Sequence, residues 1–399
     1  MIPDNILALA PEIIQWRRHL HAHPELGYEE YDTQQFILST LRSMGHYPKV
    51  AGDTGVVVDI GTSGPMVLAR ADIDALPITE DSQVDYRSQR EGAMHACGHD
   101  GHTAMLLGVA RVLPYYLGKH SGRARLIFQP AEERHPGGAL KMIRDGVLDD
   151  VVRVTGLHLQ SELPAGKIGA RLGVQSANSD RFDIVIEGKG GHGSAPHHTI
   201  DPIPVMAQMI MAMQTIVSRQ ISPTDAAVLT ISAVKSGSAY NAIPSRAELK
   251  GTVRTFKTDV QDRVIERLRQ VVENTAETFG AHAELQYRKG YPSVVNSQEE
   301  WKIFKAVVEN FAGRDAWIDV DERMGGEDFA YYLQQRPGVF WNLGAHDPQY
   351  PYPHHHNQFN FAESVMPLGV WIMVQTILAF SAAPLSLSDT QGQDAFERY

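Results

Sequence analysis

The chain has 399 residues, which is more than one hydrophobic core usually supports, so two domains are expected. Its 43% hydrophobic and 21% charged residues are typical of a folded protein and exclude a disordered one. A formal net charge of -11 argues against nucleic acid and anionic membrane as partners, because both select basic surfaces. A single cysteine, Cys97, excludes an intrachain disulfide.

We expect a cytoplasmic protein that does not bind a membrane. The N-terminal residues lack the basic start and the apolar stretch of a secretory signal. No segment approaches about 18 uninterrupted apolar residues, which is the length that a membrane-spanning helix needs.

Helices and strands are predicted to alternate through the first part of the chain. Apolar residues at helical spacing predict helices over 6–20 and 31–44. Two β-like runs, 55–60 and 66–70, flank a turn of Gly, Ser and Pro and are expected to be neighbouring strands of one sheet. The elements expected next are helix 103–112, strand 124–128, helix 138–145 and strand 152–156. This alternation is typical of an α/β layer fold.

A different pattern, β-α-β-β-α-β, follows from about residue 180. Its elements are strand 182–187, helix 202–217, strands 228–234 and 247–255, helix 260–279 and strand 283–287. This order forms a self-contained four-stranded antiparallel sheet, so we predict an inserted ferredoxin-like α+β domain over 180–290. Residues 1–179 and 291–399 then form one catalytic α/β domain with a central mixed sheet flanked by helices. Its polar end, 386–399, is expected to fray.

Potential metal ligands cluster at the ends of predicted strands and in the loops that follow. Cys97 and His99 stand two residues apart just before a helix, and thiolate and imidazole are good ligands for zinc-like ions. A free cysteine alone is more often a small buried hydrophobe, but the His and Asp residues around Cys97 reverse those odds. Glu132 and Glu133 end an apolar strand, where an adjacent pair of acids is usually solvated.

Two histidine positions complete the set. His158 ends another short buried strand, where a lone histidine is more often a satisfied core residue. A histidine triplet, 354–356, lies inside an aromatic stretch near the C-terminus. Each cluster alone is weak evidence, whereas the combination of Cys/His, Glu/Glu, His and His specifically indicates a metal site.

Ordered motifs extend over nearly the whole chain. They occupy residues 17–26, 69–77, 95–102, 129–133, 190–202, 241–244 and 324–329. In these motifs the chain resembles the M20 metallopeptidase superfamily, and specifically its branch of aminoacylases, hippurate hydrolases and indole-acetyl-amino-acid hydrolases. So many motifs in the same order are very improbable by chance.

The resemblance implies a centre with two divalent metal ions. The matching ligands are Cys97, His99, Glu133, His158 and one histidine of the triplet. Cys97 stands where relatives outside this branch use a bridging carboxylate. Counting back from Phe359 in the family motif His-x-Pro-x-Phe selects His355, but Asn357 replaces the usual proline, so His356 is the alternative. The donor set suits zinc, and cobalt or manganese would also fit.

Glu132 matches the general base of the family. Two metal ions can polarise an amide carbonyl and lower the pKa of a bound water to about 7. Glu132 would take the proton of that water and pass it to the leaving amine. Because neighbours on an extended strand end point in different directions, we expect Glu133 to bind metal while Glu132 faces the water. Asp74, just past strand 67–71, is predicted to orient His99.

The predicted insert carries further candidates. His192 lies among glycines and matches a residue that, in relatives, stabilises the oxyanion in the active site of a neighbouring subunit. Asn241 matches a substrate-binding asparagine, and Arg254, Gly325 and Gly326 are weaker substrate-site candidates.

The same resemblance implies a homodimer or homotetramer, with the insert serving in dimerisation. It would also close over the site as a lid, with hinges at 178–182 and 288–292.

The sequence therefore predicts an enzyme that hydrolyses the amide bond of small N-acyl-L-amino acids. Alternatives within the class are an N-acetyl-diaminopimelate-type deacetylase, an indole-acetyl-amino-acid hydrolase and a small dipeptidase. A non-catalytic metal-binding or storage protein would leave Glu132 without a role. An acyltransferase with Cys97 as nucleophile, assisted by His99 or His102, would leave the other ligand candidates unexplained.

Overall fold

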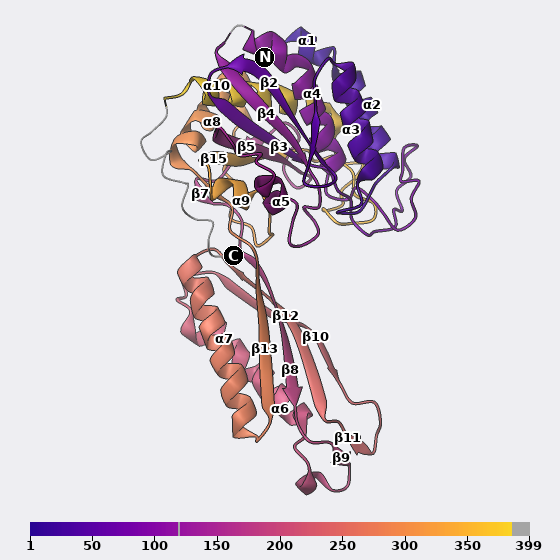
Figure 1. Ribbon diagram of the computed structural model, residues 1–399, viewed down its shortest axis with the longest axis vertical. Coiled ribbons are helices and arrows are strands. Elements are labelled where there is room, and N and C mark those ends of the chain that lie inside the picture. Colours follow the sequence, from indigo (N-terminus) through magenta and orange to yellow (C-terminus); the bar gives the residue numbers. More distant parts are fainter. Residues whose placement is uncertain (119, 385–399) are drawn as a thin grey trace. The chain divides into compact units, whose positions relative to one another are not determined.

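The computed structural model describes residues 1–118 and 120–384, so the segment expected to fray lies outside the described residues (Figure 1). The chain divides into two compact units. Unit 1 comprises residues 1–175, 294–321 and the chain from 328 onward. Unit 2 comprises residues 176–293 together with the short segment 322–327, which lies outside the predicted insert.

Unit 1 is built on a seven-stranded mixed sheet in the order β1-β2-β4-β3-β5-β15-β6. The strands are β1 (Lys49–Ala51), β2 (Gly55–Ser63), β3 (Met66–Asp72), β4 (Gly122–Gln129), β5 (Val151–Gln160), β6 (Ile168–Gly169) and β15 (Gly338–Gly344). Strands β4, β3, β5 and β15 are parallel to one another, and β1, β2 and β6 are antiparallel to their neighbours. The predicted central mixed sheet is confirmed.

One expectation about this sheet was wrong, because β2 and β3 are not neighbours. β4 lies between them, antiparallel to β2 and parallel to β3. Every residue of β3 is buried, so this strand takes a central place with a partner on each side, whereas the end of β2 is exposed. A short turn between two strands thus predicted a hairpin that burial did not allow.

Helices cover both faces of the sheet (Figure 1). Along β3, Val67 and Ala69 face the larger core, while Met66 and Leu68 face the smaller core on the other side, as the two-residue repeat of a strand requires. The helices are α1 (Asp4–Leu7), α2 (Ala10–Ala22), α3 (Tyr31–Ser43), α4 (His99–Leu117), α5 (Ala139–Arg144), α8 (Gln298–Phe311), α9 (Ala330–Leu333) and α10 (Met366–Ala382). Helix α4 begins four residues before its predicted start, at His99 itself.

One helix, Glu363–Ala382, is long and apolar enough to cross a membrane by length and composition alone. In the structure 78% of its most apolar window is buried, and Val370, Ile377 and Phe380 belong to the larger core. Such burial is typical of a core helix. Its apolar run in the sequence is interrupted by Gln375 and Thr376.

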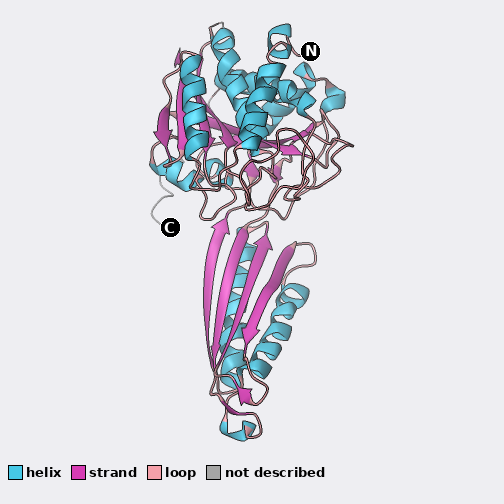
Figure 2. Ribbon diagram, turned by 90° about the vertical axis from the view of Figure 1, so that its right-hand side faces the viewer, coloured by secondary structure: helices cyan, strands magenta, loops and turns pink. Residues whose placement is uncertain are grey.

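Unit 2 has the predicted β-α-β-β-α-β order and the ferredoxin-like sheet β10-β12-β8-β13, all antiparallel (Figures 1 and 2). Its main elements are β8 (Ser179–Glu187), α6 (Pro202–Thr215), β10 (Ala227–Ser236), β12 (Arg246–Thr255), α7 (Thr258–Thr278) and β13 (His282–Tyr291). Phe182, Ile184 and Ile186 alternate along β8 and pack in one core with residues of α6 and α7. Asp201 caps α6 by accepting a hydrogen bond from the Ile203 amide at 2.9 Å.

Candidate metal centre

The predicted ligands of unit 1 lie at the ends of the parallel strands. Asp72 ends β3 and Asp74 lies just past it, residues 130–133 follow β4, and His158 is near the end of β5. Cys97 and His99 lie at the start of α4. Because the carboxyl ends of parallel strands meet at one edge of a sheet, segments distant in sequence come together there.

Two groups of potential ligand atoms share the Cys97 thiol. In one group the atoms of Cys97, His99 and His158 lie within 4.8 Å of one another, and in the other those of Cys97, Glu133 and His355 do. Cys97 Sγ is 3.4 Å from His158 Nε2, and His355 Nε2 is 3.2 Å from Glu133 Oε1. The structure therefore brings together all five predicted ligands, with the cysteine common to both groups.

The charges around the thiol are suited to cations. Burial and the carboxylates of Glu133 and Glu132 raise the pKa of the Cys97 thiol well above its ordinary value. Although burial opposes protonation of His99, the Asp72 and Asp74 carboxylates raise its pKa to about 10. An excess of negative charge thus surrounds these side chains. A bound cation would lower the pKa of the Cys97 thiol again, because a coordinating thiol loses its proton.

Asp74 fixes both His99 and the glutamate pair. The His99 Nδ1 atom donates a hydrogen bond to the main-chain oxygen of Asp74 at 2.9 Å, which leaves Nε2 to face the site. Among the described residues, His99 Nε2 has no hydrogen-bond partner. The Asp74 carboxylate is 3.3 Å from His99 Nδ1 and also accepts the amides of Glu132 and Glu133, both at 3.0 Å. It therefore holds the main chain that carries the predicted base.

The expected geometry of the glutamate pair was wrong. β4 ends at Gln129, and Glu132 and Glu133 follow in a bend after Ala131, whose φ is 54°. Both carboxylates have an oxygen within 4.8 Å of the same His99 nitrogen, so they do not point to opposite faces. Alternation along an extended strand does not apply in a bend, and the amides of Glu132 and Glu133, which donate to the Asp74 carboxylate, fix the main chain there.

Three acidic or histidine residues near the site were missed by the sequence interpretation. Asp72 Oδ1 accepts from His102 Nδ1 at 2.6 Å, while His102 Nε2 accepts the Leu159 amide at 2.8 Å. Both nitrogens of His102 are thus occupied, although Asp72, His99 and His102 lie close enough to hold an ion. Buried Glu30 accepts the Ala131 amide at 2.8 Å, and burial together with the Asp74 charge raises the pKa of Glu30 to about 7. Asp72 and His102 belong to the quoted motifs, which was the available signal.

The members of the histidine triplet do three different things. His354 Nε2 accepts the Ser161 amide at 3.3 Å. His355 has a left-handed φ of 66°, donates its amide to the Ala96 oxygen at 2.8 Å, and directs its ring to Glu133. His356 stacks on Tyr352 with ring centroids 4.5 Å apart. Of the two alternatives, His355 is the one that the structure brings to the ligand group.

Within unit 2, His192 and Asn241 lie side by side. The short strands β9 (Gly191–His192) and β11 (Ala242–Ile243) pair antiparallel, and the Gly193 amide donates to the Asn241 oxygen at 2.8 Å. His192 Nδ1 accepts the Ser194 amide at 3.2 Å, so the neutral ring carries its proton on Nε2. Both side chains are exposed, and His192 therefore offers a hydrogen-bond donor to solvent.

The weaker candidates have mainly local contacts in unit 2. The Arg254 guanidinium donates to the main-chain oxygens of Val253 at 3.1 Å and Asp180 at 3.4 Å. A Cβ atom at Gly326 would lie 2.8 Å from Ser179 Cβ, which requires a small residue there for packing. Gly325 has open space around its Cα. Their predicted role in substrate binding stays a prediction.

The chain matches the model of peptidase family M20/M25/M40 over residues 68–379. It belongs to this family. An N-acyl-L-amino acid amidohydrolase of Geobacillus stearothermophilus is 45% identical over 291 residues, which cover 72% of this M20 chain and 79% of the relative. The IAA-amino acid hydrolase ILR1-like 2 of Arabidopsis thaliana is 38% identical over 398 residues, or 96% and 90% of the two chains.

A solved structure supports the same assignment. The dinuclear metal binding peptidase of the M20 family from Bacillus subtilis is 34% identical, has a TM-score of 0.83, and matches over 94% of this chain and 99% of its own. The M20 protein described here is accordingly a metal-dependent hydrolase of amide bonds, and its predicted family and fold are confirmed.

Proposed function

We propose that this M20 enzyme hydrolyses N-acyl-L-amino acids to a carboxylic acid and a free amino acid, with two divalent ions bound. The observation that carries the proposal is the Cys97 thiol shared by two ligand groups, with the Glu132 carboxylate beside them. The names of the relatives, which include an N-acyl-L-amino acid amidohydrolase, support this substrate class.

Each ion would be held by three side chains of unit 1. Cys97, His99 and His158 would hold one ion, and Cys97, Glu133 and His355 the other. A set of thiolate, imidazole and carboxylate donors favours zinc, and cobalt or manganese would be accepted as well. When bound, the two ions supply a Lewis acid for the amide carbonyl and lower the pKa of water.

Glu132 is the proposed general base. Its carboxylate takes one proton from the attacking water as the C–O bond forms, and then passes that proton to the nitrogen of the leaving amino acid as the C–N bond breaks. The Asp74 carboxylate, by accepting the Glu132 amide at 3.0 Å, fixes the main chain from which this base extends. Glu132 is only 7% exposed, which protects the proton transfer from bulk water.

His192 is the proposed oxyanion donor. Its Nε2 proton, set by the bond from Ser194 to Nδ1, would stabilise negative charge that develops on the substrate oxygen. We keep the prediction that this donor comes from a neighbouring subunit of a homodimer or homotetramer, with Asn241 beside it binding substrate. The cytoplasmic location also stays a prediction.

The test is amino-acid release, detected with ninhydrin, from a panel of N-acetyl, N-benzoyl and longer N-acyl amino acids. Wild type, Glu132→Gln and the control Glu29→Gln are compared before and after metal removal, since Glu29 is an exposed surface glutamate 3.7 Å from Arg134. We expect release that needs metal and that falls by about 10²–10⁴-fold in Glu132→Gln only.

Other outcomes would favour the alternatives. Activity that survives chelation and ends on alkylation of Cys97 would indicate the cysteine nucleophile. Release from dipeptides but from no N-acyl amino acid would indicate a dipeptidase, and release from neither would contradict the proposed substrate class.

A further inference from the structure

A buried arginine in α2 joins two segments that carry predicted ligands. Arg17 is fully buried, and its Nε donates to Asp100 Oδ2 at 2.8 Å. One terminal nitrogen donates to Asn360 Oδ1 at 2.8 Å, and the other to Glu363 Oε1 at 3.1 Å. Asp100 follows His99 directly in the chain, and Asn360 lies in the loop that begins with His355.

Two aromatic rings lie close to the guanidinium. The Arg17 Cζ atom lies 4.9 Å from the ring centroid of Tyr86 and 4.5 Å from that of Phe361. The Tyr86 hydroxyl accepts from Asn360 Nδ2 at 2.9 Å. A planar guanidinium that donates to three side chains and packs near two aromatic rings makes contacts that a lysine ammonium cannot reproduce.

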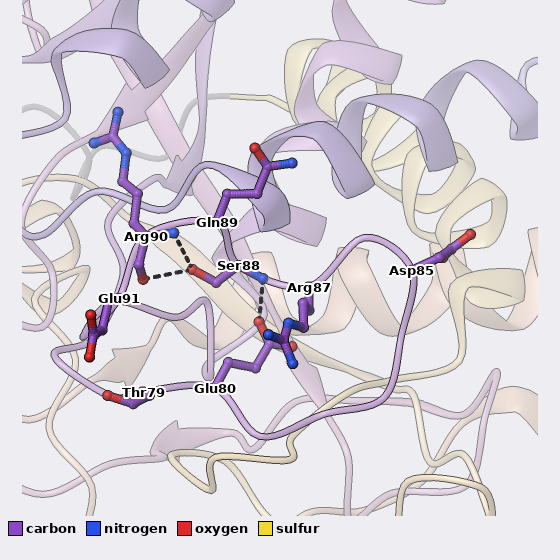
Figure 3. Close-up of a pocket in the computed structure, with 8 residues that line it drawn as sticks. All are labelled: Thr79, Glu80, Asp85, Arg87, Ser88, Gln89, Arg90 and Glu91. Atoms are coloured by element: carbon purple, nitrogen blue, oxygen red, sulfur yellow. Dashed lines mark hydrogen bonds between the residues drawn. The ribbon is translucent and has the colours of Figure 1, made fainter.

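His21, one turn further along α2, extends this contact to a third segment. Its Nδ1 lies 2.8 Å from Asp100 Oδ2, and its Nε2 lies 3.1 Å from Glu80 Oε1. With a carboxylate at each nitrogen, the buried ring donates on both sides. Glu80 in turn accepts the Ser88 amide at 2.6 Å, as Figure 3 shows.

The segment anchored by Glu80 has no helix or strand from residue 79 to residue 91. It lines an open pocket of about 590 Å³, so close packing does not hold it on that side (Figure 3). Glu80 and Tyr86 therefore help to fix the segment against α2, through their contacts with His21 and Arg17. Directly after Glu80, the Asp81 amide donates to the Asn357 oxygen at 2.8 Å, which ties the segment to the loop of His355.

None of these side chains belongs to the proposed ligand groups. They connect the main chain around the ligands instead, because Asp100 moves with Cys97 and His99, and Asn360 moves with His355. The Ala96 oxygen already accepts the His355 amide at 2.8 Å, so a small shift of either segment would change the distances between the ligands.

We propose that Arg17 and His21 are positioning residues that set the spacing between the Cys97/His99 segment and the His355 loop, and thereby the affinity for both metal ions. The inference rests on the proposed function, since it takes those residues as ligands. Residues that orient metal ligands from outside typically change metal affinity or activity by about 10–100-fold when they are replaced.

The experiment measures metal affinity of the full chain by chelator competition with Co²⁺, and follows the thiolate-to-cobalt absorption band as a signature of Cys97. The variants are Arg17→Lys and the control Arg153→Lys, because Arg153 is also buried in unit 1 and donates to Glu300 at 2.8 Å away from the ligand groups. The unfolding temperature of each metal-free variant is recorded beside it.

We expect Arg17→Lys to lower the affinity for both ions by about 10–100-fold, to shift the cobalt band, and to lower kcat with little change in KM. Arg153→Lys should lose stability but keep the wild-type affinity and band. Wild-type affinity in Arg17→Lys with a lowered unfolding temperature would overturn the inference and leave Arg17 a purely structural role.

A milder variant covers the case in which Arg17→Lys does not fold. Asn360→Ala removes the bond from Arg17 to the His355 loop, together with the bonds that join Asn360 to the Tyr86 hydroxyl and the Phe361 amide, and leaves the bond from Arg17 to Asp100 in place. The affinity for one ion should therefore fall while the other stays unchanged. If Asn360→Ala binds each of the two ions with the same affinity as wild type does, the inference is contradicted. A wild-type protein that binds no metal would contradict the proposed function itself.

Discussion

The candidate residues of the two units differ in how firmly they are held. In unit 1 His99 and Asp74 are buried, and Asp74 accepts hydrogen bonds from His99 and from the amides of Glu132 and Glu133, although His355 is exposed. In unit 2 His192 is exposed, and the hydrogen bonds of its ring go to Ser194. In the proposed mechanism the residues of unit 1 would hold the ions, and the exposed His192 of unit 2 would meet the substrate.

The largest effect should come from replacing the thiol that both ligand groups share. Cys97→Ser replaces a soft ligand common to both groups with a hydroxyl that keeps its proton, so binding of both ions should fall far more than 100-fold. Metal content after dialysis and amino-acid release measure the two losses. Two ions retained in Cys97→Ser would show that the thiol is not a shared ligand.

Replacing the exposed His192 should separate catalysis from metal binding. His192→Ala removes the proposed oxyanion donor, so kcat should fall by about 10²–10³-fold while metal content stays that of wild type. His198→Ala is the matched control, because it is an exposed histidine in the same turn region. If both variants keep full activity, His192 has no part in the reaction.

The smallest effect concerns the buried carboxyl of Glu30 in unit 1. Burial holds the pKa of Glu30 at about 7, above its ordinary value of 4.5, so the folded state keeps a proton that the unfolded chain has lost. The free energy of unfolding should therefore fall by about 3 kcal/mol as the pH rises from about 5 to about 8.

Glu30→Gln lacks this proton, so its unfolding free energy should not show that decrease. Urea unfolding of the metal-free proteins at both pH values measures the difference. The same pH dependence in wild type and variant would mean that Glu30 ionises normally in the folded state.

Much of this arrangement followed from the sequence, because ligand identity depends on motif spacing. Cys97 and His99, two residues apart before a helix, and the count back from Phe359 to His355 led to side chains that the structure brings together. The β-α-β-β-α-β order likewise predicted the fold of unit 2.

What the sequence did not predict depends on contacts between distant segments. The bend at Ala131 is held by Glu30, about a hundred residues earlier, and the place of β4 between β2 and β3 depends on burial along the whole of β3. Asp72 and Glu30 have no periodic pattern that marks them as partners of the site, since their roles come from which amide or ring happens to face them.

The shared thiol has a consequence for how the centre fills. In the proposed centre Cys97 gives up its proton once, although it serves two ions. The first ion must displace that proton against a raised pKa, whereas the second ion finds the sulfur already ionised. The two binding events should therefore differ in their proton release, which from this thiol is confined to the first ion.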